Sequence, residues 1–595
     1  MPLTPRRRRI LSLATAATLT LALPAAGASL LASPAQSADP VADCAAPVPV
    51  AEIAAGDSVD GLTVTQGTTP TGFTGEVLGV LEDGIAPDVD MIMVDVDMPE
   101  FARTGGIWQG MSGSPVYADD GRLIGAVAYG LSYGPSPIAG ITPFAEMDDY
   151  LAGGTPVRGS LRLGAADART VAARAGITTA QAASGFRELP MPMGISGITP
   201  RRLSQLQAKG PKFVEKTSYV MGKAPAAVAG PETVIAGGNI AASVAYGDIS
   251  MAGVGTATSV CDGRVVGFGH PLALLGATTE GLHPADAIYV QPDSLGAPFK
   301  VANIAPPVGT ITDDRLTGIT GAFGAAPAAT QITSEVTYGT KSRTGTTAVS
   351  VQEFAAEATF YQLIANQDRV VDGPSKGSEL FTWTITGTDR DKPFSLTYTD
   401  RWTGTDLSSE PSYNVANLVS YLGSIDGIKV GTVDAEAAVN NDLKRHTLVA
   451  VEQRRGGQWV RVTRQAPALG RAGKPIQLRV VLGGTAGKQL RWLKPILLPK
   501  RAKGELVLAA QGGDNRYSDV GGETLAQVRA ALAKQFRHDQ VQVQVGTPDK
   551  VDFSSGDDEE FDFRRAPRLS FVSTQVTAPL ANVVSGNKLL TIVIR

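Results

Sequence analysis

Residues 105–117 read GGIWQGMSGSPVY, which places Ser112 among closely spaced glycines. Glycine adopts backbone conformations that other residues avoid, so this segment can turn tightly and leave a serine hydroxyl clear of the main chain. Such a turn also aims backbone N–H groups at one point, where they can stabilise the oxyanion formed when serine attacks a peptide carbonyl. The pattern therefore predicts Ser112 as a nucleophile, with the N–H groups of Gly110 and Ser112 as the oxyanion hole. An ordinary glycine turn remains the alternative.

A nucleophilic serine needs a base, because its hydroxyl is barely ionised at neutral pH. The chain has only four histidines, and none precedes Ser112. His270 lies in VVGFGHPLALLG at the end of an apolar strand, where a side chain can be held rigidly, so it is the first choice. His283, in the more polar loop GLHPAD, is the second, whereas His446 and His538 are expected to be exposed in charged stretches. A structural role for His270 remains open.

The third group of such a site is usually a carboxylate that orients the imidazole. In the segment DMIMVDVDM the residues alternate, so Asp95 and Asp97 share one face of a strand just before the serine loop. Both are candidates for this role. The alternative is that they form the solvated face of the strand.

Composition narrows the class of protein. The 595 residues include Gly 67 and Pro 38, and charged residues make up 18%, which favours several compact units of strands and turns. The formal net charge of −4 argues against a nucleic-acid-binding surface, and four His with two Cys argue against a Cys/His metal site. Phosphate-binding, nicotinamide and zinc-hydrolase motifs are missing, so no cofactor is expected.

The first 38 residues have the layout of a cleaved signal peptide. Arg6 to Arg9 are followed by an apolar run and then by small residues, with cleavage after Ala28 possible and after Ala38 preferred. No later segment is apolar for long enough to span a membrane, so a secreted or cell-envelope location is expected. In that oxidising compartment Cys44 and Cys261 are predicted to form a disulfide, with two independent buried cysteines as the alternative.

The residues around Ser112 resemble the SpoIVB family of serine peptidases, through TGGIWQGMSGSPVY followed by GRLIGAVAYG. The family has an aspartate fifteen residues before the serine, which corresponds to Asp97, and a histidine in a Gly-His-Pro-like strand end, which matches His270 in VVGFGHPL. The resemblance covers roughly residues 45–325. It implies a chymotrypsin-like double β-barrel and peptide-bond hydrolysis through an acyl-enzyme, with Ser112, His270 and Asp97 as the catalytic residues.

The order of the motifs departs from the founding peptidase, because here the serine segment precedes the histidine segment. A permuted order is compatible with activity, since geometry and not chain order defines a triad. The fold expected is mainly β, a permuted double-barrel core followed by β-sandwich-like domains. The expected divisions are a signal peptide (1–38), a peptidase core (39–325, with a serine-bearing half at 39–155, an Ala-rich irregular insert at 156–235 and a histidine-bearing half at 236–325), a β-rich domain (326–425), and an immunoglobulin-like region (426–595) with a helix near 523–536.

Two functions are compatible with these features. The first is an exported serine endopeptidase that acts on a protein or peptide substrate. The second is a retired peptidase core that serves as a secreted or cell-envelope binding scaffold. The β-rich C-terminal half, which is larger than a peptidase needs, motivates the second and is where a cell-envelope partner could bind.

Overall fold

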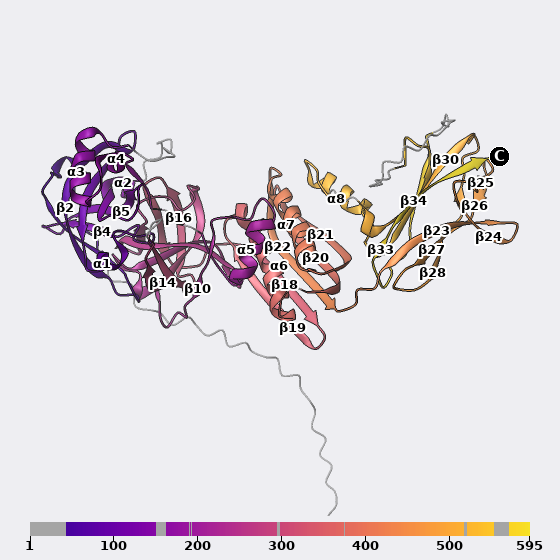
Figure 1. The fold of residues 1–595 in the computed structure, drawn as a ribbon, viewed down its shortest axis with the longest axis horizontal. Coiled ribbons are helices and arrows are strands. Elements are labelled where there is room, and N and C mark those ends of the chain that lie inside the picture. The colour runs from indigo at the N-terminus through magenta and orange to yellow at the C-terminus, as the bar shows by residue number, and fades with distance from the viewer. Residues whose placement is uncertain are drawn as a thin grey trace, which may run out of the picture. The chain divides into compact units, whose positions relative to one another are not determined.

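The computed structural model describes residues 43–149, 162–189, 191, 193–293, 298–373, 375–516, 520–551 and 570–595 (Figure 1). Strands account for 47% and helices for 17%, which confirms a mainly β fold. The predicted signal peptide lies outside the described residues. Among the helices of the described part, none combines the length and the apolar character needed to cross a membrane.

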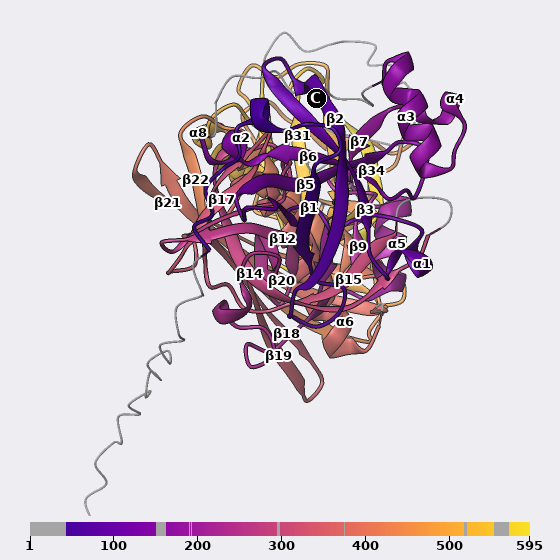
Figure 2. The same cartoon turned by 90° about the vertical axis from the view of Figure 1, so that its left-hand side faces the viewer.

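The first barrel holds the serine loop. Its strands pair in the order β4-β1-β2-β3-β6-β5, and β5 pairs again with β4, so the sheet closes on itself (Figure 2). Buried apolar side chains fill it, including Trp108 and Met111 of the serine loop. The strands are β1 (Ser58–Thr63), β2 (Thr71–Ala86), β3 (Val89–Asp97), β4 (Pro115–Ala118), β5 (Leu123–Leu131) and β6 (Ile138–Pro143).

The second barrel holds the histidine. It closes in the order β11-β12-β13-β17-β16-β14, because β14 pairs again with β11. Two closed six-stranded antiparallel barrels confirm the predicted double-barrel core. The strands are β11 (Asn239–Gly247), β12 (Ser250–Cys261), β13 (Arg264–Gly267), β14 (Gly276–Gln291), β16 (Gly309–Arg315) and β17 (Gly318–Phe323), and β15 (Phe299–Ile304) pairs with β14 outside the closed ring.

The connection between the barrels, expected to be irregular, contains helices as well as short strands. It contains α3 (Ala165–Ala175), α4 (Thr179–Ala182) and α5 (Pro200–Lys209). Alanine has the highest helix propensity, and Thr178 begins α4 with a capping box. Thr199 caps α5 through the backbone N–H of Arg202, and Pro200 takes the first helical position. Shorter helices, α1 (Phe101–Thr104) and α2 (Phe144–Asp149), flank the serine loop and β6.

A third region continues the sheet of the second barrel, since β19 pairs with β11. Its strands lie in the order β19-β18-β22-β20-β21, and two helices that the sequence analysis does not predict share a hydrophobic core with them. β22 is central in this sheet, so the sheet extends past the expected boundary at residue 425. The elements are β18 (Thr330–Tyr338), β19 (Lys341–Val349), α6 (Ala355–Val371), β20 (Gly377–Asp389), β21 (Lys392–Gly404), α7 (Ser409–Gly423) and β22 (Ile428–Asn440).

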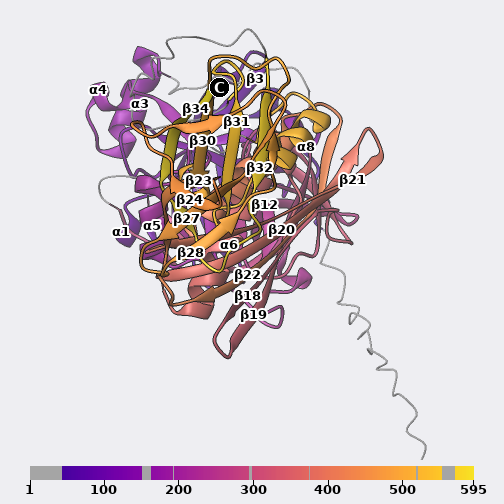
Figure 3. The same cartoon turned by 90° about the vertical axis from the view of Figure 1, so that its right-hand side faces the viewer.

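The C-terminal region has two sheets that share one apolar core, as in a β-sandwich (Figure 3). α8 (Leu525–Lys534) lies in the segment for which the sequence predicts an amphipathic helix. One sheet contains β23 (His446–Arg455), β24 (Gln458–Arg461), β27 (Leu478–Gly483), β28 (Gln489–Trp492) and β33 (Val584–Ser585). The other contains β25 (Ala468–Gly470), β30 (Glu505–Gly512), β31 (Val541–Gly546), β32 (Val572–Val576) and β34 (Asn587–Ile594).

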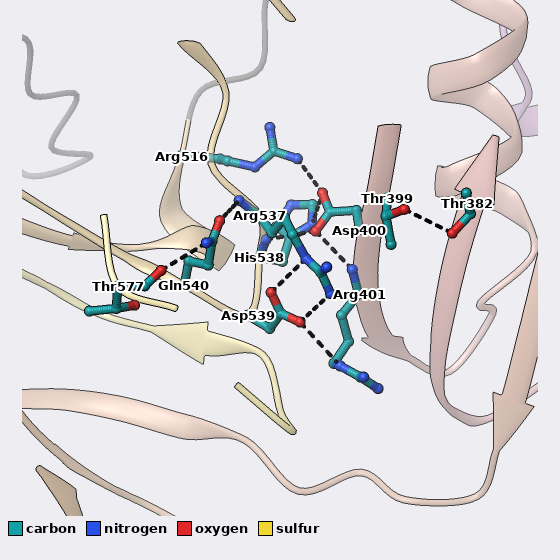
Figure 4. A network of polar contacts seen from close by, with 10 residues as sticks. All are labelled: Thr382, Thr399, Asp400, Arg401, Arg516, Arg537, His538, Asp539, Gln540 and Thr577. Carbon is teal, nitrogen blue, oxygen red and sulfur yellow. Dashed lines mark hydrogen bonds and ion pairs between the residues drawn. The ribbon is translucent and has the colours of Figure 1, made fainter. Parts of the chain in front are cut away.

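A buried ionic network joins β21 to the segment before β31 (Figure 4). Asp400 accepts a hydrogen bond from Arg516 at 2.5 Å and lies 2.9 Å from Nδ1 of His538. Burial would raise the pKa of Asp400, but hydrogen bonding and charge from His538 and Arg516 hold it below its usual value. The expectation that His446 and His538 are exposed is therefore wrong: His446 is 0% exposed and the His538 side chain 12%.

Candidate active site

The serine loop lies where the two barrels meet. The N–H of Gly113 donates to the carbonyl of Val127 on β5, and the carbonyl of Ser112 accepts from the N–H of Thr256 on β12, both at 2.8 Å. Gly113 has φ +94°, and a Cβ there would lie 1.9 Å from the carbonyl oxygen of Thr256, so only glycine fits. Both barrels therefore determine where Ser112 stands.

The histidine follows β13 through an unusual backbone turn. Phe268 and Gly269 both have positive φ, 71° and 72°, and a left-handed conformation is rare for an aromatic residue. The hydroxyl of Thr142 on β6 donates to the carbonyl of Gly269 at 2.6 Å, which ties the turn to the first barrel. Backbone strain of this kind persists where the surroundings impose it, often at functional sites.

The turn brings His270 to Ser112. Nε2 of His270 lies 2.8 Å from the hydroxyl oxygen of Ser112, and Nδ1 lies 2.8 Å from the carbonyl oxygen of Pro271. A carbonyl can only accept, so Nδ1 carries the proton and Nε2 is free to accept the serine proton. This is the tautomer that a general base requires.

Asp97 does not join this pair. It is exposed at the end of β3, whereas the hydrogen bonds and electrostatic interactions of His270 are with Ser112, Pro271 and Asp314. Its neighbour Asp95 is half-buried and lies 3.8 Å from Arg174 of α3. The register of β3 puts both carboxylates on its more exposed face, away from the core that the serine loop enters.

A different carboxylate, Asp314 of β16, interacts electrostatically with the imidazole, and its sequence context gives no signal for this role. Its two oxygens accept hydrogen bonds from the N–H groups of Leu272, Ala273 and Leu275, at 2.8, 2.8 and 3.2 Å. Burial raises the pKa of Asp314, and these three hydrogen bonds oppose the rise. Asp314 thereby holds the segment after His270 in place and sets a negative charge near the ring.

Burial also affects the base itself. It lowers the pKa of His270, while the hydrogen bond to Pro271 and the charge of Asp314 act in the opposite direction. The net effect is a neutral imidazole at neutral pH, able to accept a proton. Ser112 and His270 are 0% and 1% exposed, so the pair is closed to solvent in this structure.

The comparison with protein families agrees with these features. Residues 36–144 match the family described as SpoIVB peptidase S55. This part of the chain is of the SpoIVB type. The match includes Ser112 and supports a serine peptidase function, whereas His270 lies beyond the matched residues. Searches of curated proteins and of solved structures each find no significant match.

The predicted disulfide is present. Cys44 and Cys261 are bonded, with their Cα atoms 4.8 Å apart. Next to Cys44, the carboxylate of Asp43 accepts hydrogen bonds from Ser259 of the second barrel and from Tyr117 of the first. The N-terminal segment thus links both barrels close to the serine loop. A disulfide fits an extracellular protein.

A second serine–histidine pair occurs in the second barrel. The hydroxyl of Ser243 lies 2.7 Å from Nε2 of His283, and Nδ1 of His283 lies 2.8 Å from the carbonyl oxygen of Ala305. Burial lowers the pKa of His283 to about 4. The pair is buried within strands β11 and β14, and no glycine turn surrounds Ser243, so it lacks the donors that an acyl transfer needs.

Proposed function

We propose that this protein is an exported serine endopeptidase in which Ser112 is the nucleophile and His270 the general base. The 2.8 Å contact between Nε2 of His270 and the hydroxyl of Ser112 carries the proposal. The serine oxygen attacks the substrate carbonyl while Nε2 takes its proton. The imidazolium then gives that proton to the leaving amine, and water repeats the sequence to release the acyl group.

The turn around Ser112 supplies an oxyanion hole in this proposal. Gly110 has φ +91°, and within the described residues the N–H groups of Gly110 and Ser112 donate to no other acceptor. Two unused N–H groups beside a nucleophile can stabilise the tetrahedral oxyanion, and one such donor contributes about 3–4 kcal/mol in known cases.

In this proposal two residues share the task of orienting and stabilising the imidazole of His270. The carbonyl of Pro271 holds the Nδ1 proton, and Asp314 supplies the negative charge that favours the imidazolium in the transition state. Asp314 acts through the loop and the electric field, so it is a positioning residue. Asp97, which the family resemblance favours for this role, remains exposed on β3.

One observation favours the scaffold function as a second candidate. Because Ser112 and His270 are closed to solvent, a peptide reaches the hydroxyl only after the residues that cover it move. A core that never opens would keep its geometry and still be inactive. The β-rich C-terminal regions would then carry the function as binding modules, with a cell-envelope protein as the partner.

The deciding experiment is intact-mass analysis of purified wild type, Ser112→Ala and Ser243→Ala, each incubated alone and with casein. Ser243 is equally buried and its hydroxyl is hydrogen-bonded to a histidine ring. The Ser243→Ala variant therefore controls for the loss of a structural hydrogen bond. Fragments that appear with wild type and Ser243→Ala but not with Ser112→Ala support the endopeptidase. Fragmentation that survives Ser112→Ala would overturn it, and intact masses throughout favour the scaffold.

Export is tested on the same material. The mature secreted protein is expected to begin at Asp39, after cleavage at Ala38. N-terminal sequencing of the protein from culture medium checks this. A chain that stays in the cells with Met1 retained would contradict the proposed signal peptide.

A further inference from the structure

A large groove lies between α5 and α7, outside the residues that position the serine–histidine pair. It has a volume of about 1270 Å³ and is lined by α5, the turn that follows it, and the first half of α7. We call it the α5–α7 groove. Its size is that of a site for a peptide or a small ligand and not of a packing defect.

The groove has an aromatic floor. Phe213 and Tyr413 stack with ring centroids 6.3 Å apart and an interplanar angle of 17°, and Phe360 meets the edge of Phe213 at 5.7 Å. Tyr413 is 41% exposed, so part of this aromatic surface is open to solvent. Exposed aromatic surface of this kind is enriched where proteins bind partners.

The rim of the groove is positively charged. Arg201, Lys209 and Lys212 are exposed, and none of them forms an ion pair or a side-chain hydrogen bond within the described residues. Arg202 differs, because it is buried and paired with Asp368 and Asp406. The rim is therefore a local cationic site on a chain whose formal net charge is −4.

The acids in the groove do not neutralise this rim. Asp406 is already paired with Arg202, which leaves Glu410 as the lining carboxylate without a cation partner in the described part of the chain. Three free cations thus face one free acid around an apolar floor. Charge complementarity of this kind determines which partner is attracted and in what register it binds.

We propose that the α5–α7 groove binds an acidic peptide segment of a protein partner, with an aromatic side chain of that segment inserted against Phe213 and Tyr413. The carboxylates of the segment would pair with Arg201, Lys209 and Lys212. A nucleic acid is less favoured, because three cations neutralise too few phosphates to hold it at physiological salt. The groove includes neither Ser112 nor His270, so this proposal does not depend on whether the core is an active peptidase.

The test uses the mature full chain and a fluorescein-labelled peptide, Glu-Asp-Glu-Phe-Glu-Asp-Glu, in fluorescence anisotropy. The triple variant Arg201→Glu, Lys209→Glu, Lys212→Glu should bind at least tenfold more weakly than wild type. The matched control is Lys341→Glu, Lys392→Glu, Lys429→Glu, which reverses three exposed lysines of the third region and should bind as wild type does. Raising the salt concentration should weaken wild-type binding, since exposed charges are screened.

A second pair of measurements tests the aromatic floor. Tyr413→Ser should weaken binding several-fold, and so should replacing the phenylalanine of the peptide by serine. Equal binding by wild type and the groove triple variant overturns the proposal. Full displacement of the peptide by an equal concentration of single-stranded DNA would also overturn it. A third contrary result is a peptide that does not bind, together with self-association of the wild type that Tyr413→Ser abolishes.

Discussion

Nε2 of His270 faces the hydroxyl of Ser112 at 2.8 Å although 158 residues separate the two in the chain. Ser112 reaches this position from the first barrel and His270 from the second. The contact therefore depends on how the barrels are joined, by the disulfide at Cys44 and by hydrogen bonds such as that from Thr142 to Gly269. The permuted order of the two motifs has no effect on it.

Asp314→Asn should reduce peptidase activity more than Asp97→Asn does. The amide keeps the size of the side chain but removes the charge near His270 and one of the acceptors that hold the following loop. We expect kcat to fall about tenfold or more, whereas Asp97→Asn, at an exposed site, should leave it nearly unchanged. Steady-state kinetics on a casein-derived peptide checks this. The reverse ranking would assign the orienting role to Asp97.

Peptidase activity should persist at pH values low enough to protonate an exposed histidine. Burial lowers the pKa of His270 from its ordinary value of 6.5, so the ring stays neutral to a lower pH. The acid limb of the kcat/KM profile should therefore have its midpoint below 6.5. Asp314→Asn should move that midpoint further down, because the charge of Asp314 favours the imidazolium. A midpoint above 6.5 would mean that another group is the base.

Removing the disulfide should destabilise the core. The bond closes a sequence separation of 217 residues between the N-terminal segment and β12. The double variant Cys44→Ser, Cys261→Ser should lose about 2–5 kcal/mol of unfolding free energy. Thermal unfolding with and without a reductant checks this. Reductant should lower the Tm of wild type to that of the variant and leave the variant unchanged, whereas equal Tm values at the outset would contradict the prediction.

Lys300 should make stability depend on pH. Its Nζ is buried, donates to Oδ1 of Asn239 and forms no ion pair with a carboxylate of the described residues, and burial lowers its pKa to about 7. An unfolded lysine titrates at about 10.4, so between these values the unfolded chain binds the extra proton and the contribution of Lys300 to stability rises with pH. Burial raises the pKa of Glu280 and that of Glu379 to about 8, so these acids act in the opposite direction over this range. The contribution of Lys300, measured as the difference between wild type and Lys300→Met in the change from pH 7 to pH 9, should be about 2 kcal/mol.

Lys300→Met is expected to remove this contribution, because the side chain no longer titrates. Lys341→Met, at an exposed position on β19, should retain it and serves as the control. Urea unfolding of the three proteins at pH 7 and pH 9 provides the comparison. A Lys300→Met protein whose stability changes between pH 7 and pH 9 by the same amount as that of wild type would contradict the prediction.

Much of the core follows from local patterns. The glycines around Ser112 favour a turn locally, because glycine readily adopts the positive φ found at Gly110 and Gly113, +91° and +94°. The short alternating strands predict a mainly β fold, whereas the double barrel is implied by the family resemblance. Thr199 with Pro200 marks the start of α5. His270 is favoured by its place at a strand end and by a family resemblance. These signals are local, since backbone conformation and strand periodicity depend on neighbouring residues.

The orienting groups depend on contacts between distant segments. Asp97 has the spacing of the family motif, yet β3 presents it to solvent, while Asp314 reaches the histidine loop because β16 pairs with β14 and β17 inside the second barrel. The burial of His538 beside Asp400 has the same origin, since 138 residues separate them. The sequence alone does not reveal whether a charged side chain is solvated or buried beside a partner. The desolvation and pairing energies that decide this depend on the residues that the tertiary structure packs around it.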